Sequence, residues 1–187
     1  MAFGLWIILV IAAVFIVVII PVIYYNRFKR FENRIDNSLS QIDVQLRRRG
    51  ELVPNLIETV KGYAKHEKKI IEDVTKARAA MMGAGELQER INKGNQLQSA
   101  LKSIFALAEN YPQLKANENF LQLQQELAAI EDKIAYSRQY YNDSILTYNN
   151  SVETFPGNFF AGIFGHKEKQ FLDIPVETRA VPKVKFE

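Results

Sequence analysis

The chain contains no cysteine, which excludes disulfide bonds, cysteine-ligated zinc and thiol catalysis. Basic side chains exceed acidic ones by only three charges, too small an excess to indicate nucleic-acid binding. Patterns typical of β-strands are almost absent before residue 170, and the sequence has no glycine-rich phosphate loop and no nucleophile elbow. We therefore expect a helical protein without a cofactor.

Charge is also missing from residues 1–25, and the first charged side chain is Arg27. Phe3 to Ile23 is almost wholly apolar, and roughly 20 apolar residues in a helix cross a bilayer core. A cleaved secretory signal is the alternative, but it requires a basic N-terminal region and a shorter apolar stretch. The sequence predicts a transmembrane anchor over residues 1–25.

The charges flanking this run predict the orientation of the anchor. Arg27, Lys29, Arg30 and Arg34 follow it, and no basic residue precedes it. Positively charged flanks stay on the cytoplasmic side, so we expect a single pass of the inner (plasma) membrane, with the N-terminus outside and the remainder cytoplasmic. The predicted membrane-interface residues here are Trp6, Tyr24, Tyr25, Arg27, Lys29 and Arg30, since aromatic rings and cations favour that zone.

Apolar residues recur at helical spacing over almost all of the remaining chain. Four stripes cover residues 35–46, 52–81, 87–108 and 120–155. Turns are expected at Gly83-Ala84-Gly85 and before Pro112, with Asn117 as a helix N-cap. The predicted fold is all-α, with an antiparallel up-down four-helix bundle over residues 26–155.

The first break in this bundle has two interpretations. Pro54 could occupy the first turn of a new helix after Gly50, where a missing N–H does no harm. It could instead kink one long helix, and the seven-residue spacing from Leu39 through Leu46 and Val53 to Val60 favours continuity. With the kink, there would be three cytoplasmic helices, the first of them very long.

Residues 156–187 are predicted to form a Phe-rich loop and an extended tail. Phe159, Phe160 and Phe164 lie in a stretch that is unusually apolar for a loop. They either pack beneath the bundle or enter the bilayer interface near Arg27, Lys29 and Arg30. After Gly165 the sequence turns polar and includes two prolines, which is typical of extended chain.

Three polar residues, Gln124, Glu131 and Arg138, are spaced seven apart on one flank of the last helix. They form either an inter-helix network that meets Asp43 or Arg47, or a solvated face. This flank is the predicted interaction surface.

The remaining polar motifs are a Tyr-Asn repeat and two histidines. Tyr141-Asn142 and Tyr148-Asn149 repeat at the same seven-residue spacing, and we expect them to fix packing and register. His66 and His166 lack the converging ligands that a zinc site requires. We therefore predict no metal site and no catalytic residue.

Several motifs together resemble the LemA family across essentially the whole chain. They comprise residues 40–49, 52–56, 60–67, 108–117, 120–127, Arg138, Tyr141-Asn142, Tyr148-Asn149, Phe155-Pro156 and residues 182–186. The resemblance implies an N-terminal membrane anchor, a cytoplasmic antiparallel four-helix bundle and a turn at Pro54. It implies no established enzyme activity.

The functional expectation is a non-enzymatic, membrane-anchored scaffold that self-associates or organises membrane partners. Its expected partners are the lipid bilayer, further copies of the same chain and other membrane proteins, but not nucleic acid. The alternative is a regulatory adaptor of a membrane protease or kinase.

Overall fold

The computed structural model describes residues 2–64 and 66–172, in which every regular element is a helix. The helices are α1 (Ala2–Tyr63), α2 (Lys68–Gly83), α3 (Leu87–Ala108), α4 (Pro112–Lys115), α5 (Glu118–Glu153) and α6 (Gly157–Phe164). This confirms the all-α class. Across the described ranges, no helix combines the length and the hydropathy required to cross a membrane.

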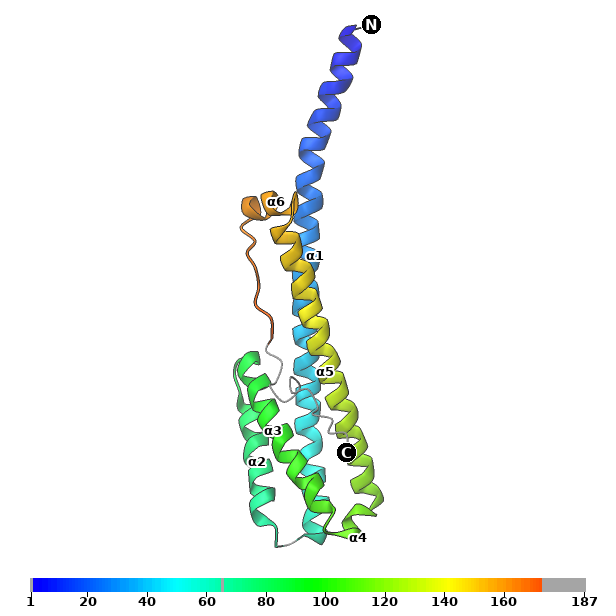
Figure 1. Cartoon of the computed structure of the whole chain (residues 1–187), viewed down its shortest axis with the longest axis vertical. Coiled ribbons are helices and arrows are strands. Elements are labelled where there is room, and N and C mark those ends of the chain that lie inside the picture. The colour runs from blue at the N-terminus through cyan, green and yellow to red at the C-terminus, as the bar shows by residue number, and fades with distance from the viewer. Residues whose placement is uncertain (1, 65, 173–187) are drawn as a thin grey trace, which may run out of the picture. The chain divides into compact units, whose positions relative to one another are not determined.

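The helices divide between two compact units, and α1 and α5 contribute to both. The middle unit is Asp36–Gln139, and the terminal unit joins the chain up to Ile35 with the chain from Tyr140 onward. In the middle unit, segments of α1 and α5 lie with α2 and α3 and run alternately up and down (Figure 1). This unit has the up-down order that the stripes predicted.

Each helix of the middle unit gives one apolar face to a shared core. The buried side chains include Leu46, Val53 and Val60 on α1, Val74 and Met81 on α2, Leu97, Leu101 and Ile104 on α3, and Leu127 and Ile134 on α5. The predicted stripes therefore identify the buried faces correctly.

The turn predicted at Pro54 is wrong, because α1 continues through it to Tyr63. In an α-helix the N–H of residue 54 would donate to the carbonyl of Gly50, and proline has no N–H to donate. Arg78 on α2 replaces that donor, since its Nε lies 2.6 Å from the Gly50 carbonyl oxygen. The continuous alternative therefore describes α1 correctly.

The absence of a side chain at Gly50 lets α2 approach α1 closely enough for this bond. A Cβ at position 50 would lie 2.6 Å from Sδ of Met82 and 2.9 Å from Cε of Met81. Gly94 serves α3 similarly, since a Cβ there would lie 2.6 Å from Cδ2 of Leu46. This close approach explains why a glycine interrupts the third stripe.

The actual break between the first two helices lies after Tyr63, where α1 ends, and before Lys68, where α2 begins, and the apolar spacing did not predict it. The connection from α3 to α5 supports it: the Tyr111 hydroxyl donates to Glu67 Oε1 at 3.2 Å, and Asn117 Nδ2 donates to the Tyr63 hydroxyl at 3.0 Å. Because α2 is a separate helix, the three-helix alternative is also wrong.

The other predicted boundaries are confirmed, with one exception. α2 ends at Gly83, α3 ends before Pro112, and the Asn117 side chain accepts a bond from the Phe120 N–H at 3.0 Å as the N-cap of α5. The exception is the expected Phe-rich loop, which instead forms the helix α6. Gly165 caps the C-terminus of this helix with a left-handed φ of 74°. Residues 166–172 carry no helix, whereas the predicted tail beyond them, with its 182–186 motif, lies outside the described residues.

The role of Arg78 predicts a specific energetic coupling. Arg78→Ala should lower the free energy of unfolding by about 1–3 kcal/mol, because the Gly50 carbonyl loses its donor. In a Pro54→Ala background the same change should cost less, because residue 54 regains an N–H for that carbonyl. Chemical denaturation of the four variants as a double-mutant cycle measures this coupling.

Lys76→Ala, which removes an exposed basic side chain of the same helix, is the control and should cost little in either background. An equal cost of Arg78→Ala in both backgrounds would contradict the proposed replacement of the backbone donor.

Candidate functional site

The terminal unit is organised around an aromatic cluster that joins α6 to α1. The rings of Tyr24 and Phe160 stack with centroids 4.7 Å apart, and Tyr25 meets Phe164 edge-on at 5.4 Å. Phe28 extends the cluster, with its ring 6.4 Å from that of Tyr24. These contacts orient α6, because they fix which of its side chains face α1.

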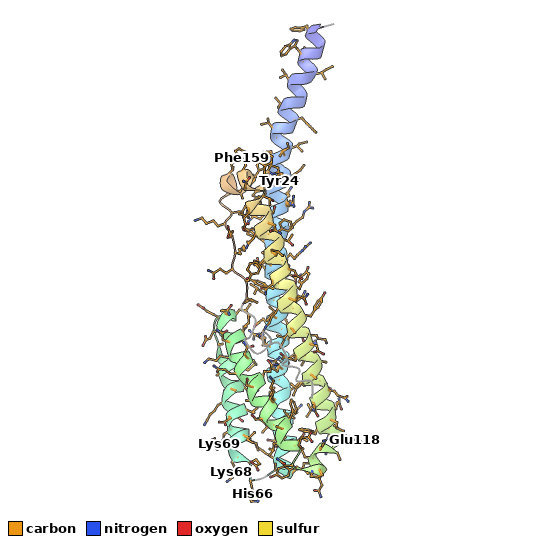
Figure 2. The ribbon with its side chains drawn as sticks, viewed as in Figure 1. Tyr24, His66, Lys68, Lys69, Glu118 and Phe159 are labelled. Carbon is orange, nitrogen blue, oxygen red and sulfur yellow. The ribbon has the colours of Figure 1, made fainter. Side chains whose placement is uncertain are left out.

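A second side of α6, together with Phe155 in the turn before the helix, remains uncovered. Phe155, Phe159 and Ile163 are spaced four apart and expose 86%, 63% and 60% of their surface. Figure 2 shows Phe159 at about the same height along α1 as Tyr24. We call these three residues the outer stripe of α6.

Basic residues follow the aromatic part of α1. The guanidinium carbon of Arg27 lies 5.9 Å from the ring centre of Tyr24 and 5.5 Å from that of Phe31. Lys29 pairs with Glu32 at 2.8 Å, and Arg30 is exposed. The terminal unit therefore places aromatic rings and cations on adjacent turns of one helix.

Two asparagines of α5 hold the chain that follows α6. The Asn149 side chain accepts from the N–H of Lys169 and donates to its carbonyl, both at 2.9 Å. Asn142 makes the same pair of bonds with Leu172, at 2.9 and 3.2 Å. Each amide thus binds one residue of the tail solely by its main chain.

The spacing of this asparagine ladder follows from backbone geometry. Seven helical residues between Asn142 and Asn149 rise ~10.5 Å, and three extended residues between Lys169 and Leu172 span ~10 Å. The tail runs opposite to α5, so two turns of helix match three residues of extended chain. The repeated Tyr-Asn motif therefore sets register, but with the tail as its partner.

His166 joins the tail to the aromatic cluster. Its ring centre lies 4.6 Å from that of Phe28, and Nδ1 is 3.3 Å from both the Tyr148 hydroxyl and Glu32 Oε1. This arrangement gives His166 a packing role, whereas His66 is exposed.

The middle unit contains a buried polar network between its helices. Arg49, only 2% exposed, forms an ion pair with Glu131 and donates to the Gly94 carbonyl at 3.2 Å. Arg138 donates to Asn95 Oδ1 at 2.7 Å. Burial, and then the charge of Arg138, lower the pKa of Arg49 to about 10, so the guanidinium is charged at neutral pH.

A second arginine closes the turn between α2 and α3. Arg90 forms an ion pair with Asp43 and donates to the carbonyl of Ala84 at 2.6 Å. Asp43 also accepts from Arg47 at 2.9 Å. These polar side chains bond to one another, and no group of three or more potential metal-ligating residues occurs in the described ranges.

Comparison with known proteins identifies the family. The family model described as LemA family matches residues 38–186, which is most of the chain. The chain belongs to the LemA family. This agrees with the motifs on which the resemblance was based.

Individual relatives of this LemA-family chain are distant. "Magnetosome protein MamQ 2" of Paramagnetospirillum magneticum is 25% identical over 173 residues, which cover 79% of this chain and 64% of the relative. "Protein LemA" of Metamycoplasma hominis is 26% identical over 137 residues, covering 73% of this chain and 63% of the relative. The chain thus spans about 64% of the length of the curated relatives that it matches.

The residues of the predicted membrane interface differ in their exposure. Trp6, Tyr25 and Phe159 are exposed, whereas Phe160 and Phe164 turn toward α1. Sequence reasoning missed the outward position of Phe155 and Ile163, although their four-residue spacing from Phe159 was available. Their contact with lipid stays a prediction.

The three residues of the predicted interaction surface also differ in their surroundings. Gln124 is exposed, but Glu131 and Arg138 bond within the middle unit, so the inter-helix network describes them better than a solvated face. Their partners are Arg49 and Asn95, and not the expected Asp43 or Arg47. Position in the Arg47-Arg48-Arg49 run alone did not distinguish the buried arginine from its exposed neighbours.

Because it pairs with the buried Arg49, Glu131 should contribute to the stability of the fold. Glu131→Lys should lower the free energy of unfolding by about 3–5 kcal/mol, because it leaves a buried guanidinium without its carboxylate and adds a like charge. Glu126→Lys makes the same change at an exposed position of α5 and should shift stability by no more than about 0.5 kcal/mol. Thermal or urea denaturation that finds equal effects would refute the buried pair.

The ladder predicts position-specific protection of tail amides. Asn149→Leu should accelerate hydrogen exchange chiefly at Lys169, and Asn142→Leu chiefly at Leu172, because each variant removes the acceptor of that N–H. Asn150→Leu, at an exposed neighbouring position, should leave both amides protected. Residue-resolved hydrogen exchange that finds no change in either ladder variant would contradict the assignment.

Proposed function

We propose that this LemA-family chain is a membrane-anchored, non-enzymatic scaffold. In this proposal the first part of α1 crosses the bilayer, and the remaining helices present surfaces to further copies of the chain and to other membrane proteins. The buried arginines between the helices form ion pairs and hydrogen bonds within the middle unit, and no reaction is assigned to them.

The observation that carries the proposal is the exposure of apolar side chains on the first part of α1. Phe3 exposes 81% of its surface and Val17 72%, and the first 25 residues have no charge. In water such exposure is unfavourable, by roughly 25 cal/mol for each Å². Acyl chains would cover these side chains without requiring a partner protein.

The orientation follows from the flanking charges. Arg27, Lys29 and Arg30 favour the cytoplasmic side, which would place the N-terminus outside and the other helices inside the cell. Cleavage of those helices by protease added to intact cells would contradict this orientation.

The anchor is tested by placing a charge in the middle of the apolar segment. Val14→Arg should reduce the fraction of protein that resists alkaline carbonate extraction, because an arginine at the centre of a span costs ~2.5–3.5 kcal/mol on insertion scales. Val44→Arg makes the same substitution at an exposed valine of the middle unit and should leave extraction unchanged. Release of the wild type by carbonate would contradict the anchor.

Self-association is tested through the exposed part of the predicted interaction surface. Because the chain has no cysteine, Gln124→Cys introduces a single reactive site. Anchoring raises the local concentration of identical copies, so a bismaleimide should yield cross-linked dimers in native membranes. A monomeric product there, together with a monomeric mass in detergent, would remove the support for a self-associating scaffold.

A further inference from the structure

The outer stripe of α6 is an apolar surface without a protein partner in the described chain. Phe159 and Ile163 each precede one of the packing residues Phe160 and Phe164, so the helix turns them ~100° from the side that packs on α1, and Phe155 is exposed in the turn before α6. α6 thus uses one face to attach to α1 and leaves the other apolar and exposed. A surface helix with a polar outer face would need no such cover.

We propose that α6 is an interfacial foot, whose outer stripe enters the lipid surface beside the point where α1 leaves the bilayer. The proposal rests on the proposed function, because it takes α1 as the anchor. The ligand is the lipid surface itself, with anionic headgroups favoured by the neighbouring cations.

The depth of α6 follows from the length of α1. From Phe3 to Tyr24 the helix rises ~32 Å, which is close to the ~30 Å of a bilayer hydrocarbon core. Tyr24 then lies at the boundary of the acyl chains. Phe160 stacks on Tyr24 at 4.7 Å, so α6 is held at the same depth (Figure 1).

The surroundings of the stripe favour lipid over a protein partner. The two residues of α1 that precede Tyr24, Val22 and Ile23, are also apolar and exposed, and Tyr24 itself holds α6 through Phe160. Arg27 and Arg30 follow within two turns and are exposed. Aromatic rings with cations on their polar side are the composition of a membrane interface.

The single tryptophan of the chain, Trp6, makes a direct test possible with the full-length protein. A Trp6→Phe/Phe159→Trp variant is reconstituted in vesicles of phosphatidylethanolamine and phosphatidylglycerol that contain a lipid brominated near the top of its acyl chains. We expect strong quenching of the position-159 fluorescence. A Trp6→Phe/Ile163→Trp variant should behave alike and guards against a local packing defect at position 159.

Phe171 provides the matched control within the terminal unit. It is an exposed phenylalanine in the tail between Lys169 and Leu172, the two residues that the asparagines of α5 bind. It therefore lies along α5 and away from α6. Trp6→Phe/Phe171→Trp should be quenched several-fold less than Trp6→Phe/Phe159→Trp. Raising the phosphatidylglycerol fraction should increase quenching at position 159, and Arg27→Gln/Arg30→Gln should reduce that increase.

Quenching of Trp6 in the wild type distinguishes a failure of the interfacial contact of α6 from a failure of the anchor. Quenching of Trp6 together with position 159 supports both. Quenching of Trp6 with positions 159 and 163 as unquenched as 171 overturns the interfacial foot and leaves the anchor intact. An unquenched Trp6 overturns the anchor itself.

Discussion

The bond from Arg78 to the Gly50 carbonyl allows α1 to remain a single helix past Pro54. Without that donor, the helix would contain a part-buried carbonyl that no backbone N–H can satisfy. The bond requires α2 to lie against α1, which the missing side chain at Gly50 permits. Continuity matters because both compact units contain a segment of α1, so a turn at Pro54 would change the helix on which the middle unit is assembled.

The two units use different chemistry to hold their helices. The middle unit combines an apolar core with interior arginines, which bind a carboxylate, a backbone carbonyl or, for Arg138, the side-chain oxygen of Asn95. Such pairs are costly when one partner is removed, so they define which helices can pack together. The terminal unit instead uses stacked aromatic rings and an amide ladder that binds main chain. In the proposed function, the first arrangement presents the scaffold surface and the second joins it to the bilayer.

Periodicity predicted the helical class and the buried faces because the apolar spacing that places Leu127 and Ile134 on one face is visible within a single helix. It could not decide the Pro54 question, because the decisive donor, Arg78, lies on another helix. The break between Tyr63 and Lys68 was missed for the same reason, since Glu67 and Tyr63 bond to the distant residues Tyr111 and Asn117. Among the candidate interface residues, Tyr24 and Tyr25 were predicted from their place after the apolar run, whereas their packing on Phe160 and Phe164 was not. The ladder was seen as a repeat, but its partner, an extended tail, has no periodic pattern.

The central claim, a continuous α1, is tested most directly by residue-resolved hydrogen exchange at Asn55, Leu56 and Ile57. In one helix their N–H groups donate to the carbonyls of residues 51–53 and should exchange as slowly as that of Val60. A helix that began with Pro54 as its first residue would leave Asn55 and Leu56 without intrahelical acceptors, whereas Ile57 would still donate to Val53. Slow exchange at all three is the predicted result, and exchange of Asn55 and Leu56 near the rate of an unprotected chain would contradict the account.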